Sequence, residues 1–180
     1  MYVTRRITPA ANSDAGRRGF INQYSLSTAF DISTISLIST TQLTEPGEDD
    51  DEFAFLPHAI EFKPDGTRMF VIKNTGTLVY QYDLSTAWDV STISFSAKYD
   101  VSGEDQLRSL DFKPDGTRMY VGGMKKHKIR QYDLATPFDL RSGVTPGGIS
   151  DSLQSFENNM RDIQFNPDGT QMFLTGNQRD

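Results

Sequence analysis

The sequence predicts an all-β protein, a fragment of a β-propeller with about three four-stranded antiparallel blades. Three observations carry this prediction. A ten-residue stretch occurs three times, its copies lie about 50 residues apart, and each copy consists of two short apolar runs joined by Pro-Asp-Gly. A fixed period of this length, with several strands in each unit, is typical of propeller blades.

The repeated stretch begins at Phe62, Phe112 and Phe165, so the spacings are 112 − 62 = 50 and 165 − 112 = 53 residues. In each copy the proline presets the first corner of a turn and the aspartate caps it. The glycine supplies a backbone angle that other residues avoid. Each copy therefore predicts a β-hairpin.

A second block recurs with the same period, beginning at Gln23, Gln81 and Gln131. Its middle copy reads Gln-Tyr-Asp-Leu-Ser-Thr-Ala-Trp-Asp-Val. We interpret it as the end of one strand, a polar turn and the start of the next strand. The turn carries an aromatic residue in every copy, namely Phe30, Trp88 and Phe138. We expect this side chain to plug the turn onto its own blade rather than to bind a ligand.

The middle unit predicts four strands, at 58–63, 68–73, 78–84 and 92–101. Both faces of the 68–73 strand are apolar, whereas a half-solvated strand would alternate apolar with polar residues. Two apolar faces indicate a blade covered by neighbours on both sides. In a propeller blade of this kind, the first strand lines the central channel.

These repeats divide one partial domain, 1–180, into successive blades. We place the last three strands of a blade in 1–43, whole blades in 57–101 and 107–155, and two strands of the next blade in 160–175. Three blades are too few to close a propeller, which typically has 4–8. We expect a longer polypeptide or self-association to supply the remaining blades.

One segment departs from this scheme. Ile149, Leu153, Phe156, Met160 and Ile163 are spaced by 4, 3, 4 and 3 residues, which is helical spacing. The repeat instead places the last strand of a blade there, and we favour the strand.

Composition excludes several classes of protein. The formal net charge of −6 argues against a general nucleic-acid surface. No apolar run approaches the roughly 18 residues of a membrane span. The chain has no cysteine, so it has neither a disulfide nor a thiolate site. We found no nucleophile elbow or phosphate loop and predict no catalytic residues and no required cofactor.

The Phe-x-Pro-Asp-Gly-Thr-x-Met hairpin resembles the repeats of WD40-like and TolB-like propellers. Together with the Gln-Tyr-Asp-Leu-Ser-Thr-Ala-Trp block, it is similar to a repeat family of marine bacterial and phage proteins, including virion-associated ones. This resemblance covers nearly the whole chain except the loops at 4–19 and 44–56. It implies a propeller fold and a location outside the cell or on a virion, although a cytoplasmic location stays open. It implies little about function, because propellers host many functions.

The best candidate binding residues occupy the same position in three blades. His58, Arg108 and Arg161 each stand four residues before the phenylalanine of the first strand. Three basic side chains near one mouth of the channel suit an anion or an acidic sugar, since arginine binds carboxylates and phosphates bidentately. The alternative, which we favour, is structural: Glu104 and Glu157 precede the two arginines by four residues, and such pairs would tie loops to their blades.

A weaker candidate is a calcium site in the acidic run 48–52. The oxygen ligands considered are Glu48, Asp49, Asp51 and Glu104. The run lacks the alternating spacing of a calcium loop, so we favour a solvated loop. The second histidine, His127, lies among lysines and is expected at the surface.

Three functions are compatible with these residues. The first is a non-catalytic extracellular or virion-associated module that has a structural role or recognises a protein or glycan on its charged loop face. The second is a lactonase-like or glycosidase-like hydrolase whose carboxylates would be Glu48, Glu104 and Glu157 at the channel mouth. The third is an intracellular scaffold that docks a protein. We favour the first.

Overall fold

The computed structural model describes residues 2–7, 18–44, 57–73, 76–104, 106–141, 143–155 and 159–177, with the backbone alone for 2–7 and 18. These residues contain thirteen strands in four antiparallel sheets and no α-helix. The all-β propeller prediction is therefore confirmed. In the part of the chain described, no helix is long and apolar enough to cross a membrane.

The N-terminal blade has the strand order β1-β2-β3, formed by Tyr2–Ile7, Arg18–Leu26 and Ile35–Gln42. The second blade has the order β4-β5-β6-β7, formed by Pro57–Phe62, Arg68–Lys73, Leu78–Leu84 and Ile93–Asp100. The third blade has the order β8-β9-β10-β11, formed by Leu107–Phe112, Arg118–Gly123, Ile129–Leu134 and Val144–Ile149. The C-terminal hairpin pairs β12 (Met160–Phe165) with β13 (Met172–Gly176).

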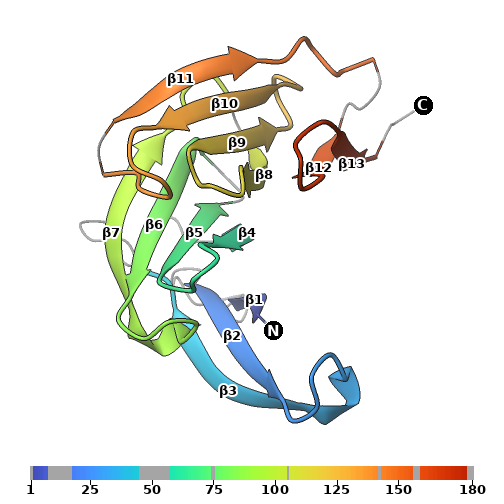
Figure 1. The fold of residues 1–180 in the computed structure, drawn as a ribbon. Coiled ribbons are helices and arrows are strands. Elements are labelled where there is room, and N and C mark those ends of the chain that lie inside the picture. The colour runs from blue at the N-terminus through green and yellow to red at the C-terminus, as the bar shows by residue number, and fades with distance from the viewer. Residues whose placement is uncertain are drawn as a thin grey trace, which may run out of the picture.

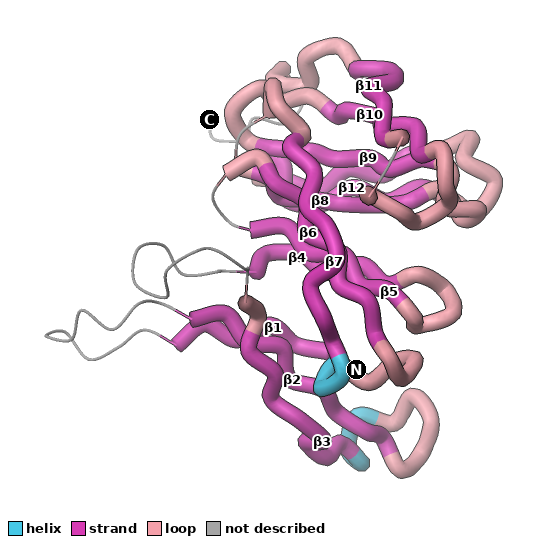
Figure 2. Tube along the Cα trace, turned by 90° about the vertical axis from the view of Figure 1, so that its left-hand side faces the viewer, coloured by secondary structure: helices cyan, strands magenta, loops and turns pink. Residues whose placement is uncertain are grey.

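The four sheets follow one another around an arc, with β3, β7 and β11 on its outer side and β4, β8 and β12 on its inner side (Figure 1). Figure 2, seen from the outer side, shows the three larger sheets stacked in chain order. The inner strands β4, β8 and β12 lie next to one another. The first strand of each of these three sheets thus lies on the inner side of the arc, where the repeat places it.

The Pro-Asp-Gly segments form the predicted hairpin turns. Asp65 accepts a hydrogen bond from the backbone N–H of Thr67 at 3.0 Å, and Asp115 accepts one from Thr117 at 2.9 Å. Gly66 has a φ of +74°, which lies in the left-handed region that favours glycine. Local chemistry alone therefore accounts for these turns.

The aromatic residue of the second block plugs its own blade in two of three cases. The indole of Trp88 lies so close over Gly66 that a Cβ there would overlap it, and Phe138 covers Gly116 in the same way. Phe30 behaves differently, because 98% of its side chain is exposed. The expectation that Phe30 plugs a turn is therefore wrong in this structure, since none of the described hairpins lies beneath it.

The helical spacing after residue 149 does not produce a helix in the described residues. Ile149 ends β11, Leu153 lies in the following loop, and Met160 and Ile163 lie in β12. The last strand of the third blade, Val144–Ile149, precedes most of the spaced residues. Phe156 lies outside the described part of the chain.

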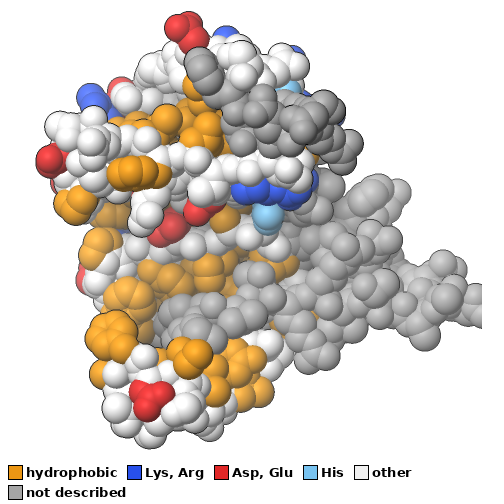
Figure 3. Space-filling model, turned by 90° about the vertical axis from the view of Figure 1, so that its right-hand side faces the viewer, with side chains coloured by type: hydrophobic (Ala, Val, Ile, Leu, Met, Phe, Trp, Pro, Cys, Tyr) orange, Lys and Arg blue, Asp and Glu red, His pale blue; other side chains and the backbone are white. Residues whose placement is uncertain are grey.

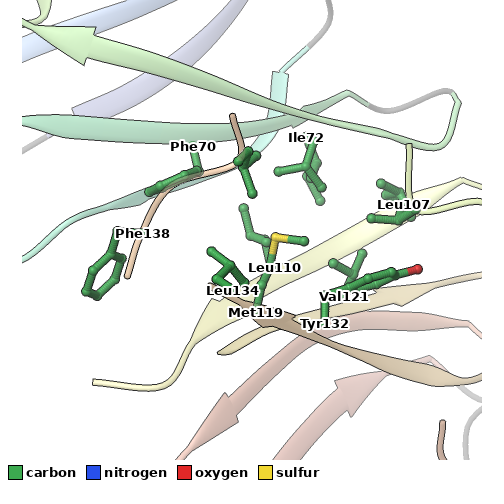
Figure 4. Packing of buried hydrophobic residues seen from close by; sticks show 12 residues of the cluster. Phe70, Ile72, Leu107, Leu110, Met119, Val121, Tyr132, Leu134 and Phe138 are labelled. Carbon is green, nitrogen blue, oxygen red and sulfur yellow. The ribbon is translucent and has the colours of Figure 1, made fainter. Parts of the chain in front are cut away.

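The core consists of apolar layers between successive blades, as the two apolar faces of β5 predict. Side chains of the second blade, including Phe70 and Ile72, point toward Leu110, Met119 and others of the third blade (Figure 4). Both faces of β5 are used, since Met69 and Val71 pack against the N-terminal blade. A smaller layer joins the third blade to the C-terminal hairpin.

Candidate functional site

The three predicted binding residues occupy the same irregular position of the inner strands. The ladders of β4, β8 and β12 against their neighbours each skip one residue, and the skipped residues are His58, Arg108 and Arg161. A β-bulge of this kind leaves one residue unpaired and redirects its side chain. The same backbone irregularity therefore occurs at the equivalent position of β4, β8 and β12.

The charges of the two arginines affect pKa values within this group, which indicates that the three side chains lie close together. Burial lowers the pKa of His58, and the positive charges of Arg108 and, less strongly, Arg161 lower it further. Burial and the charge of Arg161 also lower the pKa of Arg108. The structure therefore brings the three residues together.

One local contact holds Arg108, and one buried atom of His58 lacks a partner among the described residues. Nε of Arg108 lies 2.7 Å from Sδ of Met124 in the loop after β9. Nε2 of His58 is buried and finds no hydrogen-bond partner among the described residues. Because a buried polar atom without a partner is costly, this nitrogen marks a place where a ligand atom would be stabilised.

Acidic residues that were not predicted accompany the basic group. Burial raises the pKa of Glu61 to about 7, and the negative charges of Asp111 and Asp162 contribute to the increase. Burial likewise raises the pKa of Asp111. One carboxylate oxygen of Asp111 accepts a hydrogen bond from the backbone N–H of Phe165 at 3.1 Å, so it also joins the third blade to the C-terminal hairpin.

The sequence contained a signal for two of these acids. Glu61 and Asp111 each stand directly before the phenylalanine that ends the first strand, and Gln164 takes that place in the third copy. Asp162 has no such repeat signal. Its proximity to Glu61 follows only from the arrangement of the inner strands.

Glu104 does not belong to an open carboxylate site. Only 1% of the residue is exposed, and its Oε1 accepts a hydrogen bond from the backbone N–H of Lys126 at 2.8 Å. Its Oε2 lies 4.0 Å from Nε of Arg130. These contacts tie the loop before β8 to the loop after β9 and to β10, which is a structural role. The described residues contain no group of three His, Cys, Asp or Glu side chains placed to hold a metal ion.

The remaining predicted candidates are placed as follows. Glu48, Asp49, Asp51 and Glu157 lie outside the described residues. His127 is partly buried rather than fully at the surface, and its backbone carbonyl accepts a hydrogen bond from the N–H of Leu153 at 2.8 Å.

Together these residues form two layers along the inner strands. One layer is basic, with His58, Arg108 and Arg161, and the other is acidic, with Glu61, Asp111 and Asp162. Figure 3 looks at the inner side of the arc and shows Lys or Arg atoms beside His atoms, with Asp or Glu atoms close by. The basic layer suits a carboxylate or phosphate group, and the acidic layer suits hydroxyl or amine donors of the same molecule.

Comparison with known proteins shows the fold alone. No family model and no curated protein sequence matches the chain. Among solved structures, a putative 6-phosphogluconolactonase from Bacteroides uniformis is 15% identical with a TM-score of 0.60, covering 94% of this chain and 49% of that one. The periplasmic gluconolactonase of Pseudomonas aeruginosa is 13% identical with a TM-score of 0.57, covering 87% of this chain and 40% of that one.

A third similar structure is the β-propeller domain of Cps50 (Swd1) from Myceliophteria thermophila. It is 12% identical with a TM-score of 0.53, and the match covers 97% of this chain and 50% of that one. The chain thus spans about half the length of these propellers. The similarity supports a WD40-like propeller fold and leaves the marine and phage type a prediction.

Proposed function

We propose that this protein is a non-catalytic propeller module that binds the anionic group of a ligand at the inner strands, through His58, Arg108 and Arg161. The observation that carries the proposal is the repeated bulge, which presents a basic side chain at the same position of three successive blades. The buried, unpartnered Nε2 of His58 supports it. We extend the proposal to an extracellular or virion-associated role, in keeping with the sequence resemblance.

The acidic layer narrows the ligand to one that also offers hydrogen-bond donors. Glu61 and Asp111 would accept hydrogen bonds from hydroxyl groups a short distance from the anion. A uronic acid or another acidic sugar carries both groups on one ring. This fits a glycan ligand better than inorganic phosphate, which offers few donors.

The test is a glycan array with uronic-acid, sialylated and sulfated glycans beside neutral ones, followed by calorimetry with each hit. Arg108→Ala removes a charge-assisted hydrogen bond worth about 1.5–3 kcal/mol, so affinity should fall about tenfold to a hundredfold. Lys98→Ala on the outer strand β7 makes the same change of charge and should leave affinity unchanged. Binding that is insensitive to Arg108→Ala and His58→Ala would refute this site.

A second candidate is hydrolysis of a sugar lactone. Its support is the carboxyl of Glu61, whose pKa is raised to about 7, the range that general acid–base catalysis requires. The gluconolactonase names of two similar structures point to the same chemistry for those proteins. Hydrolysis of glucono-1,5-lactone above the buffer rate, lost in Glu61→Gln, would replace the binding proposal, and a rate equal to buffer would remove this candidate.

A further inference from the structure

Successive blades are joined by a repeated side-chain contact. Gln23 of β2 donates through Nε2 to the carbonyl oxygen of Trp88 at 2.8 Å and accepts the N–H of Val90 through Oε1 at 3.0 Å. Gln81 of β6 accepts the N–H of Leu140 through Oε1 at 2.7 Å. In both cases a glutamine of one blade binds the turn before the last strand of the next blade.

An arginine reinforces the second of these contacts. Nη1 of Arg68 donates to the carbonyl oxygen of Phe138 at 2.8 Å and lies 3.3 Å from the carboxylate of Asp139. Its Nε pairs with Asp83 at 3.0 Å. The second blade therefore binds three groups of this turn, namely the carbonyl oxygen of Phe138, the carboxylate of Asp139 and the N–H of Leu140.

The apolar residue of the bound turn is buried by the preceding blade. Val90 is 0% exposed and Leu140 is 5% exposed. The aromatic residue also extends a ring stack: Phe70 and Phe112 lie 4.5 Å apart between ring centroids, and Phe112 and Phe138 lie 5.4 Å apart. A turn bound in this way thus contributes both hydrogen bonds and core.

The third blade and the C-terminal hairpin present the same set of turn-binding groups, and none of the described residues places a turn on them. Nε2 of Gln131 donates to Asp133, as that of Gln81 does to Asp83, but its Oε1 accepts no hydrogen bond from the described residues. Arg118 pairs with Asp133 at 3.0 Å, as Arg68 pairs with Asp83. Gly169 has a φ of +72° and nothing within 4 Å of its Cβ position.

The apolar part of this turn-binding set is exposed. Tyr120 and Phe165 form a ring pair at 4.4 Å, which corresponds to Phe70 and Phe112, and no described ring continues the stack. Met172 is 40% exposed, whereas Met69 is completely buried at the equivalent position. Tyr120, Gln131, Ile149, Phe165 and Met172 line one open groove. We call Gln131, Gly169 and this groove the tail site.

The N-terminal blade presents the matching turn, and no described residue covers it. Phe30 is 98% exposed and Ile32 is 72% exposed, although the equivalent Val90 is completely buried. The turn is nevertheless formed, because Asp31 accepts the N–H of Ser33 at 3.0 Å in the same cap that follows Trp88. We call residues 30–32 the head turn.

We propose that the tail site of one copy binds the head turn of a second copy. In this arrangement Oε1 of Gln131 accepts the N–H of Ile32, and Arg118 binds Asp31. Phe30 covers Gly169 and continues the ring stack beyond Phe165. Each of these contacts already occurs within the chain. The glutamine contact and the covering of a glycine by an aromatic ring each occur twice, and the contact of the arginine with the aspartate occurs once.

One strand must move for this contact to form. β1 and β13 both occupy the second position of a blade, and Met1-Tyr2-Val3 matches Met172-Phe173-Leu174 in sequence. Only one of them can pair with β2, so β13 of one copy replaces β1 of the other. The composite blade is then β12-β13 from one copy and β2-β3 from its partner.

Two copies of residues 1–180 would contribute a number of blades that suits a closed ring. Each copy holds two four-stranded sheets and contributes to two composite blades, so two copies give 2 × 2 + 2 = 6 blades. Propellers typically have 4–8 blades. The head turn and the tail site are different surfaces, so the contact between copies is head-to-tail. Such a contact continues into a filament unless the rotation between copies closes a ring, and in this arrangement the ring closes at two copies.

The test uses two variants of the whole chain. Ile32→Asp blocks the head turn and Met172→Asp blocks the tail site, both at exposed positions. We expect the unaltered chain to sediment as a dimer and each variant alone as a monomer. A 1:1 mixture of the variants should form a dimer again through the one intact head and the one intact tail. Ser94→Asp introduces the same charge at an exposed position of the second blade and should leave the dimer unchanged.

Circular dichroism checks that every variant is folded. Gln131→Ala provides a second tail variant that leaves the hairpin intact. It should weaken dimerisation by about tenfold for each of the two composite blades, because each of them loses one hydrogen bond. A monomeric unaltered chain throughout a concentration series overturns the proposal. So does association that survives both Ile32→Asp and Met172→Asp, or a mixture of the two that stays monomeric.

Discussion

The aromatic plug provides a sharp test of how the blades are stabilised, through Gly116→Ala. A Cβ at Gly116 would overlap the ring of Phe138, and the φ of +73° is itself unfavourable for alanine. The backbone strain costs about 1–2 kcal/mol. Expelling a ring that is only 6% exposed adds a large part of the roughly 3–5 kcal/mol that truncation of a buried phenylalanine costs. We therefore expect Gly116→Ala to lower the free energy of unfolding by about 4 kcal/mol or more.

Gly169→Ala is the matched control for this prediction. Gly169 has nearly the same φ, +72°, but nothing lies within 4 Å of its Cβ position. Its replacement should therefore cost only the backbone strain of about 1–2 kcal/mol. Both changes are compared in the Ile32→Asp background, so that association does not contribute.

Urea unfolding followed by circular dichroism measures both free energies, and thermal unfolding provides a second measure. For a chain of this size about 1 kcal/mol shifts the Tm by roughly 2–4 °C, so the two variants should differ by about 5–10 °C. Equal losses in Gly116→Ala and Gly169→Ala would show that the plug contributes nothing. A Phe138→Ala change should also remove most of the extra cost of Gly116→Ala, because the two groups are in contact.

Three further predictions concern the blade contacts and the acidic layer. Gln81→Ala leaves the N–H of Leu140 unpaired inside an interface and should cost about 1–3 kcal/mol in urea unfolding, whereas Gln131→Ala in the monomer should cost under about 0.5 kcal/mol. Phe30→Ser should leave the stability of the monomer unchanged within about 0.5 kcal/mol, since the side chain is 98% exposed; a clear loss would mean that Phe30 packs within its own chain. The folded-state pKa of Glu61, about 7, lies above its ordinary value of 4.5, so its contribution is present below pH 4.5 and is lost as the pH rises through 7. That loss is at most about 3 kcal/mol, and Glu61→Gln should abolish this part of the pH dependence; an unchanged stability profile would contradict the burial of a protonated carboxyl.

The repeat determined the strands and turns because their causes are local. Pro-Asp-Gly specifies a hairpin within four residues, and the expected strands at 68–73 and 78–84 agree with β5 and β6 residue for residue. The same periodicity identified His58 and its two arginine counterparts as equivalent positions. It could not show that all three sit at bulges, since a bulge depends on the ladder with the neighbouring strand.

What only the tertiary structure decided are the contacts between residues far apart in the chain. Gln23 reaches a turn 67 residues away, and the pKa of Glu61 depends on acids contributed by two later blades. No pattern within one repeat records such distances. Phe30 illustrates the limit: its sequence is that of a plug, and it is exposed because the described residues place no hairpin under it. A side chain's environment is set by what packs against it, and in a propeller that surface belongs to another part of the ring.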